Sequence, residues 1–286
     1  MQRLFRAIPL AALLTGAGVG AVSAQDWRTI STLRRFAGED LLRVNVEYGA
    51  GRLTITPGAE NSLFRATLRY DANVFRPVSE YRDGELKLGV SGGKISGRNM
   101  RSGRLDLALG TAVPLDLNLQ FGAAEADVEL GGLRIREAEI KTGASRTNVR
   151  VSKANPESCS SARFEVGAAS FEVEGLGNLN CGDISFSGGV GDVILDLTGA
   201  WRRDTDIEID MGLGSLTLRV PRDLGIAVRK SSVLASFDSQ GLIKRGDVYY
   251  SEGFDDASQK ITINIDAALG SIRVLWVEGN SRGRRN

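Results

Sequence analysis

The stretch IEIDMGLGSLTLRV, residues 207–220, decides the fold. Apolar residues alternate with polar ones up to Met211, and the alternation resumes at Leu216, one residue out of phase. A period of two predicts β-strands with one buried face. A shift of one residue would turn that face to solvent unless the chain bends. We therefore predict a corner at Gly212–Gly214, where glycine can adopt backbone angles that other residues resist.

This strand–corner–strand unit recurs along the chain. We call its second small residue the corner residue; a large apolar residue usually follows two positions later. The corner residues from Ala124 to Ala235 are spaced by 21, 24, 22, 23 and 21 residues. Because such a β unit cannot bury its own apolar face, it must stack on copies of itself. The full set is Gly51, Ala124, Ser145, Ala169, Gly191, Gly214, Ala235 and Gly270.

The predicted fold is therefore all-β: a β-solenoid, similar to a parallel β-helix, built from repeats of about 22 residues. The corner residues are expected to lie in a column and in chain order, each above the last, so that the Gly270 coil ends the array. An antiparallel β-sandwich with glycine-rich hairpins is the alternative, because it would also alternate and turn often. Hairpin loops, however, rarely recreate one small residue at a fixed step.

The predicted organisation has four parts. Residues 1–24 form a leader, 39–109 an N-terminal β module, 110–278 the regular solenoid and 279–286 a basic tail. The run from Ser91 to Gly103 is expected to be an exposed loop. The tail, with Arg282, Arg284 and Arg285, is either a solvated terminus or a contact for acidic envelope polymers.

The leader combines a basic start, a short apolar middle and small residues before Ala24, which is typical of a secretory signal peptide. A retained membrane anchor is the alternative, but the apolar run is shorter than the ~20 residues that a spanning helix needs. The predicted product is exported to the periplasm or the exterior and keeps no transmembrane anchor after cleavage. Cleavage would leave 34 basic and 35 acidic residues, since the leader holds two of the 36 Lys and Arg and none of the 35 Asp and Glu. This near-neutral balance argues against nucleic acid as a partner.

Two cysteines remain, Cys159 and Cys181, and they are one repeat apart. In a solenoid this spacing places them on neighbouring coils, where the ~4.8 Å strand separation suits a disulfide. Export to an oxidising compartment favours the bond. A metal site or a reactive thiol is the competing interpretation, but no histidine or third cysteine supports it.

An insertion at residues 239–260 lengthens the step from Ala235 to Gly270 to 35 residues. Loops on regular scaffolds often hold binding sites, so its aromatic and acidic residues are candidate partner contacts. Alternatively, the insertion caps the end of the solenoid, as terminal repeats require. The candidate contacts are Tyr249, Tyr250, Phe254, Asp255 and Asp256.

The chain contains no histidine, which removes serine and cysteine triads and the usual zinc sites. Catalytic, cofactor and metal residues are therefore not predicted. A polysaccharide-active enzyme that uses Glu252, Asp255 or Asp256 is the alternative, because some glycan chemistry needs only carboxylates. Three or more carboxylates facing one groove would favour that alternative.

Three segments carry a resemblance to a known family. Residues 44–55, VNVEYGAGRLTI, followed by a strand with Pro77, resemble the N-terminal module of toast-rack proteins. Residues 249–257 and 261–274, YYSEGFDDA and ITINIDAALGSIRV, look like the end of the LiaF-like toast-rack domain of bacterial envelope proteins. The resemblance implies a link to cell-envelope stress responses and brings no catalytic residue, and the predicted function is a non-catalytic interaction or scaffold role in envelope stress or adhesion. The expected partner is another envelope protein or a cell-surface polymer.

Overall fold

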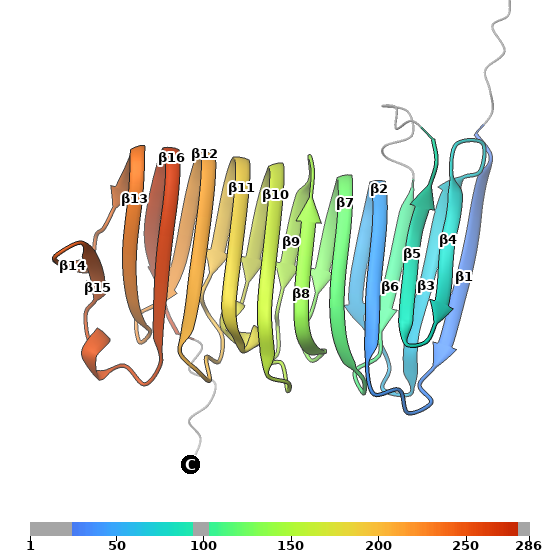
Figure 1. The fold of residues 1–286 in the computed structure, drawn as a ribbon, viewed down its shortest axis with the longest axis horizontal. Coiled ribbons are helices and arrows are strands. Elements are labelled where there is room, and N and C mark those ends of the chain that lie inside the picture. The colour runs from blue at the N-terminus through green and yellow to red at the C-terminus, as the bar shows by residue number, and fades with distance from the viewer. Residues whose placement is uncertain (1–24, 94–102, 280–286) are drawn as a thin grey trace, which may run out of the picture.

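A computed structural model describes residues 25–93 and 103–279, and over these ranges the chain folds into one long β array (Figure 1). The predicted leader, most of the basic tail and part of the 91–103 loop lie outside the described residues. Two short 3-10 helices, η1 (Leu176–Leu179) and η2 (Phe254–Asp256), lie in the connections. The strands are β1 (Trp27–Arg35), β2 (Leu42–Pro57), β3 (Ser62–Asp71), β4 (Arg76–Arg82), β5 (Glu85–Ser91), β6 (Arg104–Leu109), β7 (Pro114–Glu129), β8 (Arg134–Thr142), β9 (Arg146–Arg150), β10 (Cys159–Glu174), β11 (Cys181–Asp196), β12 (Thr205–Pro221), β13 (Gly225–Asp238), β14 (Leu242–Arg245), β15 (Val248–Ser251) and β16 (Lys260–Val277).

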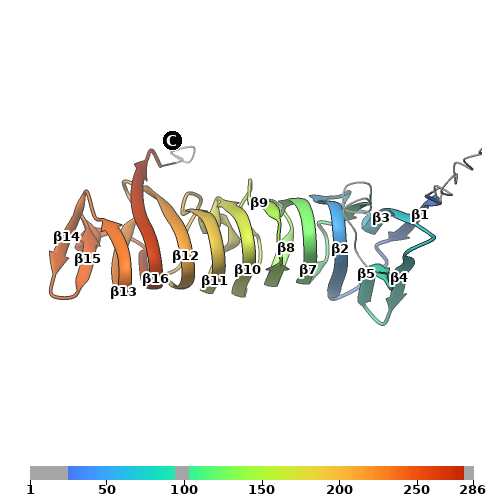
Figure 2. The same cartoon turned by 90° about the horizontal axis from the view of Figure 1, so that it is seen from above.

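The solenoid prediction is confirmed by the strand pairing. Each long strand bends at its corner and contributes to two layers, with its neighbours stacked beside it (Figures 1 and 2). Neighbouring coils pair in parallel, which rules out the antiparallel sandwich. The corner residues pair with one another as a column: Gly51 with Ala124, Ala169 with Gly191, Gly191 with Gly214, and Gly270 with both Gly214 and Ala235. The coil of Ser145 is interrupted between β8 and β9, but the Ser145 carbonyl still accepts a hydrogen bond of 3.2 Å from the Ser170 amide.

The corner column needs glycine where the coils are closest. Gly214 has a φ of +139°, and a Cβ built on it would lie 1.9 Å from the carbonyl oxygen of Gly191. A side chain there would meet both backbone strain and a direct clash. The predicted reason for small corner residues, close stacking, therefore holds in the structure.

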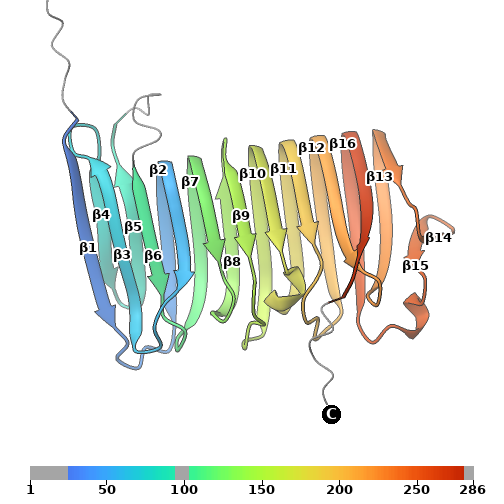
Figure 3. The same ribbon diagram turned by 180° about the vertical axis from the view of Figure 1, so that it is seen from behind.

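The expected order of the last coils is wrong. The Gly270 strand, β16, lies between β12 and β13, so the Ala235 coil stands nearer the end (Figure 3). The apolar pattern explains why: β16 buries Ile265, whereas the residue of β13 paired with it is Lys230. A lysine is costly to bury between two neighbouring coils, but at the last coil it can reach water.

At the other end, β2 is parallel to β7, to β5 and to β6, so the ladder crosses the predicted boundary at residues 109 and 110. β1, β3 and β4 add antiparallel pairs there. The division into modules stays a prediction, but residues on both sides of it contribute to one continuous hydrophobic core.

The core lies between the two layers of the array. Phe164, Phe171 and Phe186 are almost completely buried, and their tilted rings have centroids 5.7 Å apart within β10 and 5.6 Å apart between β10 and β11. Aromatic pairs at this separation stabilise a core beyond their area burial alone.

The predicted disulfide is confirmed. Cys159 and Cys181 are bonded, with Cα atoms 4.2 Å apart, and they are register partners on β10 and β11. Closing a loop of this length stabilises the fold by about 3 kcal/mol. The bond fits an exported protein, because oxidising compartments preserve disulfides.

No helix in the described ranges is long and apolar enough to cross a membrane.

Candidate binding surface

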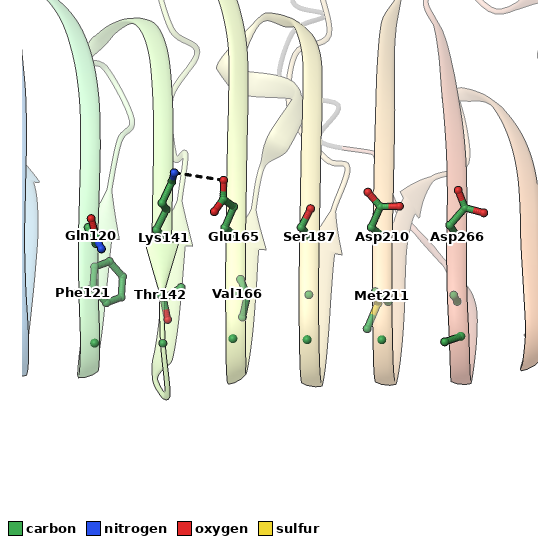
Figure 4. Close-up of a pocket in the computed structure, with 18 of the residues that line it drawn as sticks. Gln120, Phe121, Lys141, Thr142, Glu165, Val166, Ser187, Asp210, Met211 and Asp266 are labelled. Carbon is green, nitrogen blue, oxygen red and sulfur yellow. Dashed lines mark ion pairs between the residues drawn. The ribbon is translucent and has the colours of Figure 1, made fainter.

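We call the layer formed by the strand halves before the corner residues the first layer, and the layer formed by the halves after them the second. An open groove runs along the outer face of the first layer, beside the corners (Figure 4). Its volume is about 1300 Å³, and its lining comes from every coil between β2 and β13. One wall is the polar row, which we define as the residues four positions before each corner residue. They point outward because alternate residues of a strand face opposite sides. The polar row consists of Glu47, Gln120, Lys141, Glu165, Ser187, Asp210, Asp266 and Ser231.

The floor of the groove is a stripe of glycines two positions before the corner residues. A Cβ built on Gly122 would lie 2.5 Å from the Gly49 carbonyl oxygen, and one on Gly212 would lie 2.5 Å from the Gly189 carbonyl oxygen. The coils leave little room for side chains here, and the outer face is largely bare backbone and therefore hollow; β16 has the small Ala268 at this position. The stripe consists of Gly49, Gly122, Gly143, Gly167, Gly189 and Gly212.

Charge is distributed unevenly along the polar row. Lys141 lies 3.0 Å from Glu139 and 3.4 Å from Glu165, and the hydrogen bond to Glu139 is the main cause of its raised pKa. Asp210 and Asp266 are register partners on β12 and β16, are exposed, and form no ion pair or hydrogen bond with any described residue. The half of the groove near the C-terminal coils therefore holds two carboxylates without an ion-pair partner among the described residues, while the Lys230 ammonium on the next strand bonds the Ser232 hydroxyl at 2.9 Å.

A second hollow of about 510 Å³ lies further from the corners on the same face. Asp183, Asp206 and Glu208 line it, between Arg163 on one side and Arg229 on the other. The first layer therefore presents mixed charge along two open hollows, which suit contact with another macromolecule more than enclosure of a small molecule.

The aromatic residues of the insertion separate onto two sides. Tyr249 packs edge-on against Phe237, with ring centroids 4.9 Å apart, and contacts the end of the core. Tyr250 packs against Phe254 at 4.9 Å, outside that contact. Tyr249 therefore closes the core, whereas Tyr250 and Phe254 form a separate, half-buried pair.

The acids of the insertion differ in their surroundings. Asp255 forms an ion pair of 2.9 Å with Arg245, which also lies over the Tyr250 ring at 5.3 Å. Asp256 is exposed. The structure thus brings Tyr250, Phe254 and Asp255 together around Arg245, but none of the predicted contact residues lines the groove.

The carboxylates that line the groove meet the count named above for glycan chemistry, but not its geometry. Glu165, Asp210 and Asp266 project from one side in one row (Figure 4), and Glu47 lines the groove at the equivalent position of β2. A glycosidase needs two carboxylates that flank the bond from opposite sides. The described residues also hold no group of three or more carboxylate or cysteine ligands placed to bind a metal ion.

Sequence reasoning missed the groove, although its signal is present. When the repeats are aligned on their corner residues, the polar row and the glycine stripe appear as two columns.

The fold and this surface define the class: a parallel β-solenoid with a long open groove on one layer. The model of the N-terminal domain of toast_rack matches residues 22–174, more than half of the chain. The model described as cell wall-active antibiotics response LiaF, C-terminal, matches residues 174–274. The chain belongs to the toast-rack family, with a LiaF-like C-terminal part, as the resemblance predicted.

Solved structures with a similar course of the chain include three from different bacteria. A candidate cell adhesion protein from Clostridium sporogenes is 18% identical, with a TM-score of 0.47, over 88% of this chain and 100% of that one. A candidate adhesin from Bacteroides fragilis is 13% identical, with a TM-score of 0.39, over 87% and 97%. A candidate lipid binding protein from Parabacteroides distasonis is 12% identical, with a TM-score of 0.33, over 89% and 98%. No curated protein matches the chain.

Proposed function

We propose that this chain is an exported, non-catalytic envelope protein that presents the grooved face of its solenoid to another envelope protein or to a cell-surface polymer. The observation that carries the proposal is the groove itself, which continues across all the stacked coils without a catalytic constellation among the described residues. A long, open surface with a row of polar side chains along one wall supports binding to an extended partner.

Three further observations support this role. The description of the C-terminal family names a response to cell wall-active antibiotics. The disulfide and the signal-peptide pattern support a periplasmic or extracellular location. The function is therefore scaffolding or recognition linked to envelope stress or adhesion, and it requires no cofactor.

The experiment places one bulky charge in the groove and a matched one outside it. Ser187 and Ser170 are both exposed serines, the first in the polar row of β11 and the second beyond the corner on β10. The Ser187→Arg substitution should abolish cross-linking of the mature protein to its envelope partners in intact cells, whereas Ser170→Arg should leave it unchanged. Equal cross-linking by both variants would exclude the groove as the contact surface.

The insertion is proposed as a second, smaller contact. Asp256 is exposed, so Asp256→Lys reverses a charge without breaking a described ion pair. It should reduce cross-linking without changing the melting temperature. Retained cross-linking would leave the insertion with a capping role alone.

The alternative function is a polysaccharide-active enzyme that uses carboxylates of the 252–256 loop. Glu252, Asp255 and Asp256 all lie at the exposed end of the array. Incubating the mature protein with a panel of envelope glycans separates the two functions, because hydrolysis releases new reducing ends and elimination creates unsaturated products. Either product, lost in the Asp256→Asn variant, would replace the binding role with catalysis.

A further inference from the structure

Four exposed aliphatic side chains form a continuous row along the corner of the C-terminal coils. They are Val190, Leu213, Leu269 and Leu234, each immediately before a corner residue, and they are 52%, 45%, 46% and 70% exposed. Val190 pairs with Leu213, Leu213 with Leu269, and Leu269 with Leu234. Because parallel strands are ~4.8 Å apart, this aliphatic row extends over roughly 14 Å.

The fold does not require these large side chains. The same position holds alanine in the earlier coils, at Ala50, Ala123, Ala144 and Ala168. The corner is built in the same way there, and Ala168 is the register partner of Val190. Alanine is sufficient for the corner. Larger apolar side chains exposed on four adjacent coils therefore add an unfavourable free energy of hydration without improving the packing. A contiguous exposed apolar patch of this kind marks an interaction site.

Uncompensated negative charge lies beside the aliphatic row. Asp210 and Asp266 of the polar row face each other on β12 and β16, without a partner among the described residues. Like charges placed directly opposite each other destabilise a sheet. The outer face of the second layer instead neutralises its charges across strands, as in Arg52–Glu125 at 2.9 Å and Arg150–Glu174 at 2.8 Å. The Asp210–Asp266 pair is therefore suited to a cationic partner.

The spacing of the row distinguishes between the possible forms of that partner. An α-helix repeats every 5.4 Å, so side chains on successive turns nearly match the ~4.8 Å steps of the row. In a partner bound as an extended strand, side chains on one face are ~6.6 Å apart, so they fall out of step with the aliphatic row within two coils. The neighbouring Gly189 and Gly212 leave bare backbone, which lets a helix approach closely.

We propose that the aliphatic row, together with Asp210 and Asp266, docks a basic amphipathic helix of a partner protein. Apolar residues on one face of the helix pack along the row, and Lys or Arg residues on its flank pair with the two aspartates. This inference names the partner class for one end of the grooved face and so rests on the proposed binding function. A second copy of this chain fits less well, because a self-contact would bring the aspartates of both copies close together. An anionic membrane fits less well for the same electrostatic reason.

The test uses a synthetic helical peptide with Leu at positions i, i+4, i+7 and i+11 and Lys on both flanks, titrated against the full mature protein by fluorescence anisotropy. Binding should weaken at least tenfold in Leu213→Ser/Leu234→Ser. It should weaken about fivefold in Asp210→Asn/Asp266→Asn, and this charge-dependent part should fade as salt rises. Leu275→Ser and Asp127→Asn, which change an exposed leucine and an exposed aspartate of the second layer, should bind as the unchanged protein does.

Three outcomes would overturn the proposal: equal binding of a scrambled peptide with the same composition, equal binding by the row variants, or binding to phosphatidylglycerol vesicles but not to the peptide. Circular dichroism verifies that the serine variants are folded, and Leu213→Ala/Leu234→Ala serves as a milder pair. If the peptide test fails while Ser187→Arg still abolishes cross-linking in cells, the binding function stands and only the partner class is wrong.

Discussion

At the scale of single residues, the corner column leaves no room for a side chain at its glycines. Gly214→Ala would place a Cβ 1.9 Å from the Gly191 carbonyl oxygen at a φ of +139°, so we expect a loss of about 3 kcal/mol in the free energy of unfolding. Gly246→Ala is the control, since Gly246 also has a positive φ, +63°, but a Cβ added there would meet nothing within 4 Å. That variant should lose about 1 kcal/mol. Urea denaturation measures both, and equal losses would contradict close stacking as the cause.

A second prediction concerns Tyr48, whose side chain is 2% exposed and whose hydroxyl has no hydrogen-bond partner within the described part of the chain. Tyr48→Phe removes a buried, unsatisfied polar group, so we expect stability to rise by about 1 kcal/mol at pH 7. Thermal or urea unfolding measures the change. Tyr81→Phe, a half-buried control, should change little.

The same residue predicts a pH dependence. Burial, followed by the nearby Asp106 charge, raises the pKa of Tyr48 in the folded state. In the unfolded chain the Tyr48 phenol ionises near pH 10. Below that pH, the stability that comes from this difference in pKa is therefore fully present. It is lost as pH rises from there towards the folded-state pKa. Tyr48→Phe should therefore flatten the decline in stability above pH 10, and an unchanged decline would assign it to other groups.

At the scale of elements, the β14–β15 hairpin covers the outer edge of β13 and closes the core through Tyr249. Its contact with Phe237 leads us to expect that Tyr249→Ser lowers the free energy of unfolding by about 2 kcal/mol and increases binding of a hydrophobic dye. Tyr250→Ser, whose contact is with Phe254 outside the core, is the matched control and should cost about half as much. Equal costs would mean that the hairpin does not cap the core.

At the scale of the whole molecule, the last strand in the chain is an internal strand of the array. β16 pairs with β12 on one side and β13 on the other, whereas β13 has only the short strand β15 on its far side among the described strands, so the amides of β16 should exchange more slowly than those of β13. Hydrogen–deuterium exchange on the peptides that contain Ile263 and Ile226 measures this. Truncation before Lys260 should also destabilise β13 and its hairpin, because β16 is the strand that pairs β13 with the rest of the array among the described strands. Slow exchange in β13 after that truncation would contradict the observed order.

Much of the fold could be predicted because its physical cause is local. The one-residue shift at Gly212–Gly214 requires a bend, and the near-constant step between corners requires stacking. The same step placed Cys159 and Cys181 on neighbouring coils. The candidate site was harder to predict. The aromatic and acidic composition of the insertion is visible in the sequence, whereas the groove exists only when several coils lie side by side.

By itself, the sequence determined the repeating bend, the buried face, the disulfide and the family, since each follows from residue spacing along one chain. Only the tertiary structure decided the order of the last coils, the groove, and the row from Val190 to Leu234. Parallel coils of equal length have no local preference for a neighbour. Their order depends on which strand can be buried between two others and which must keep a charge near water, as with Lys230 opposite Ile265. The surface that these coils present arises from stacking, a property that no single repeat contains.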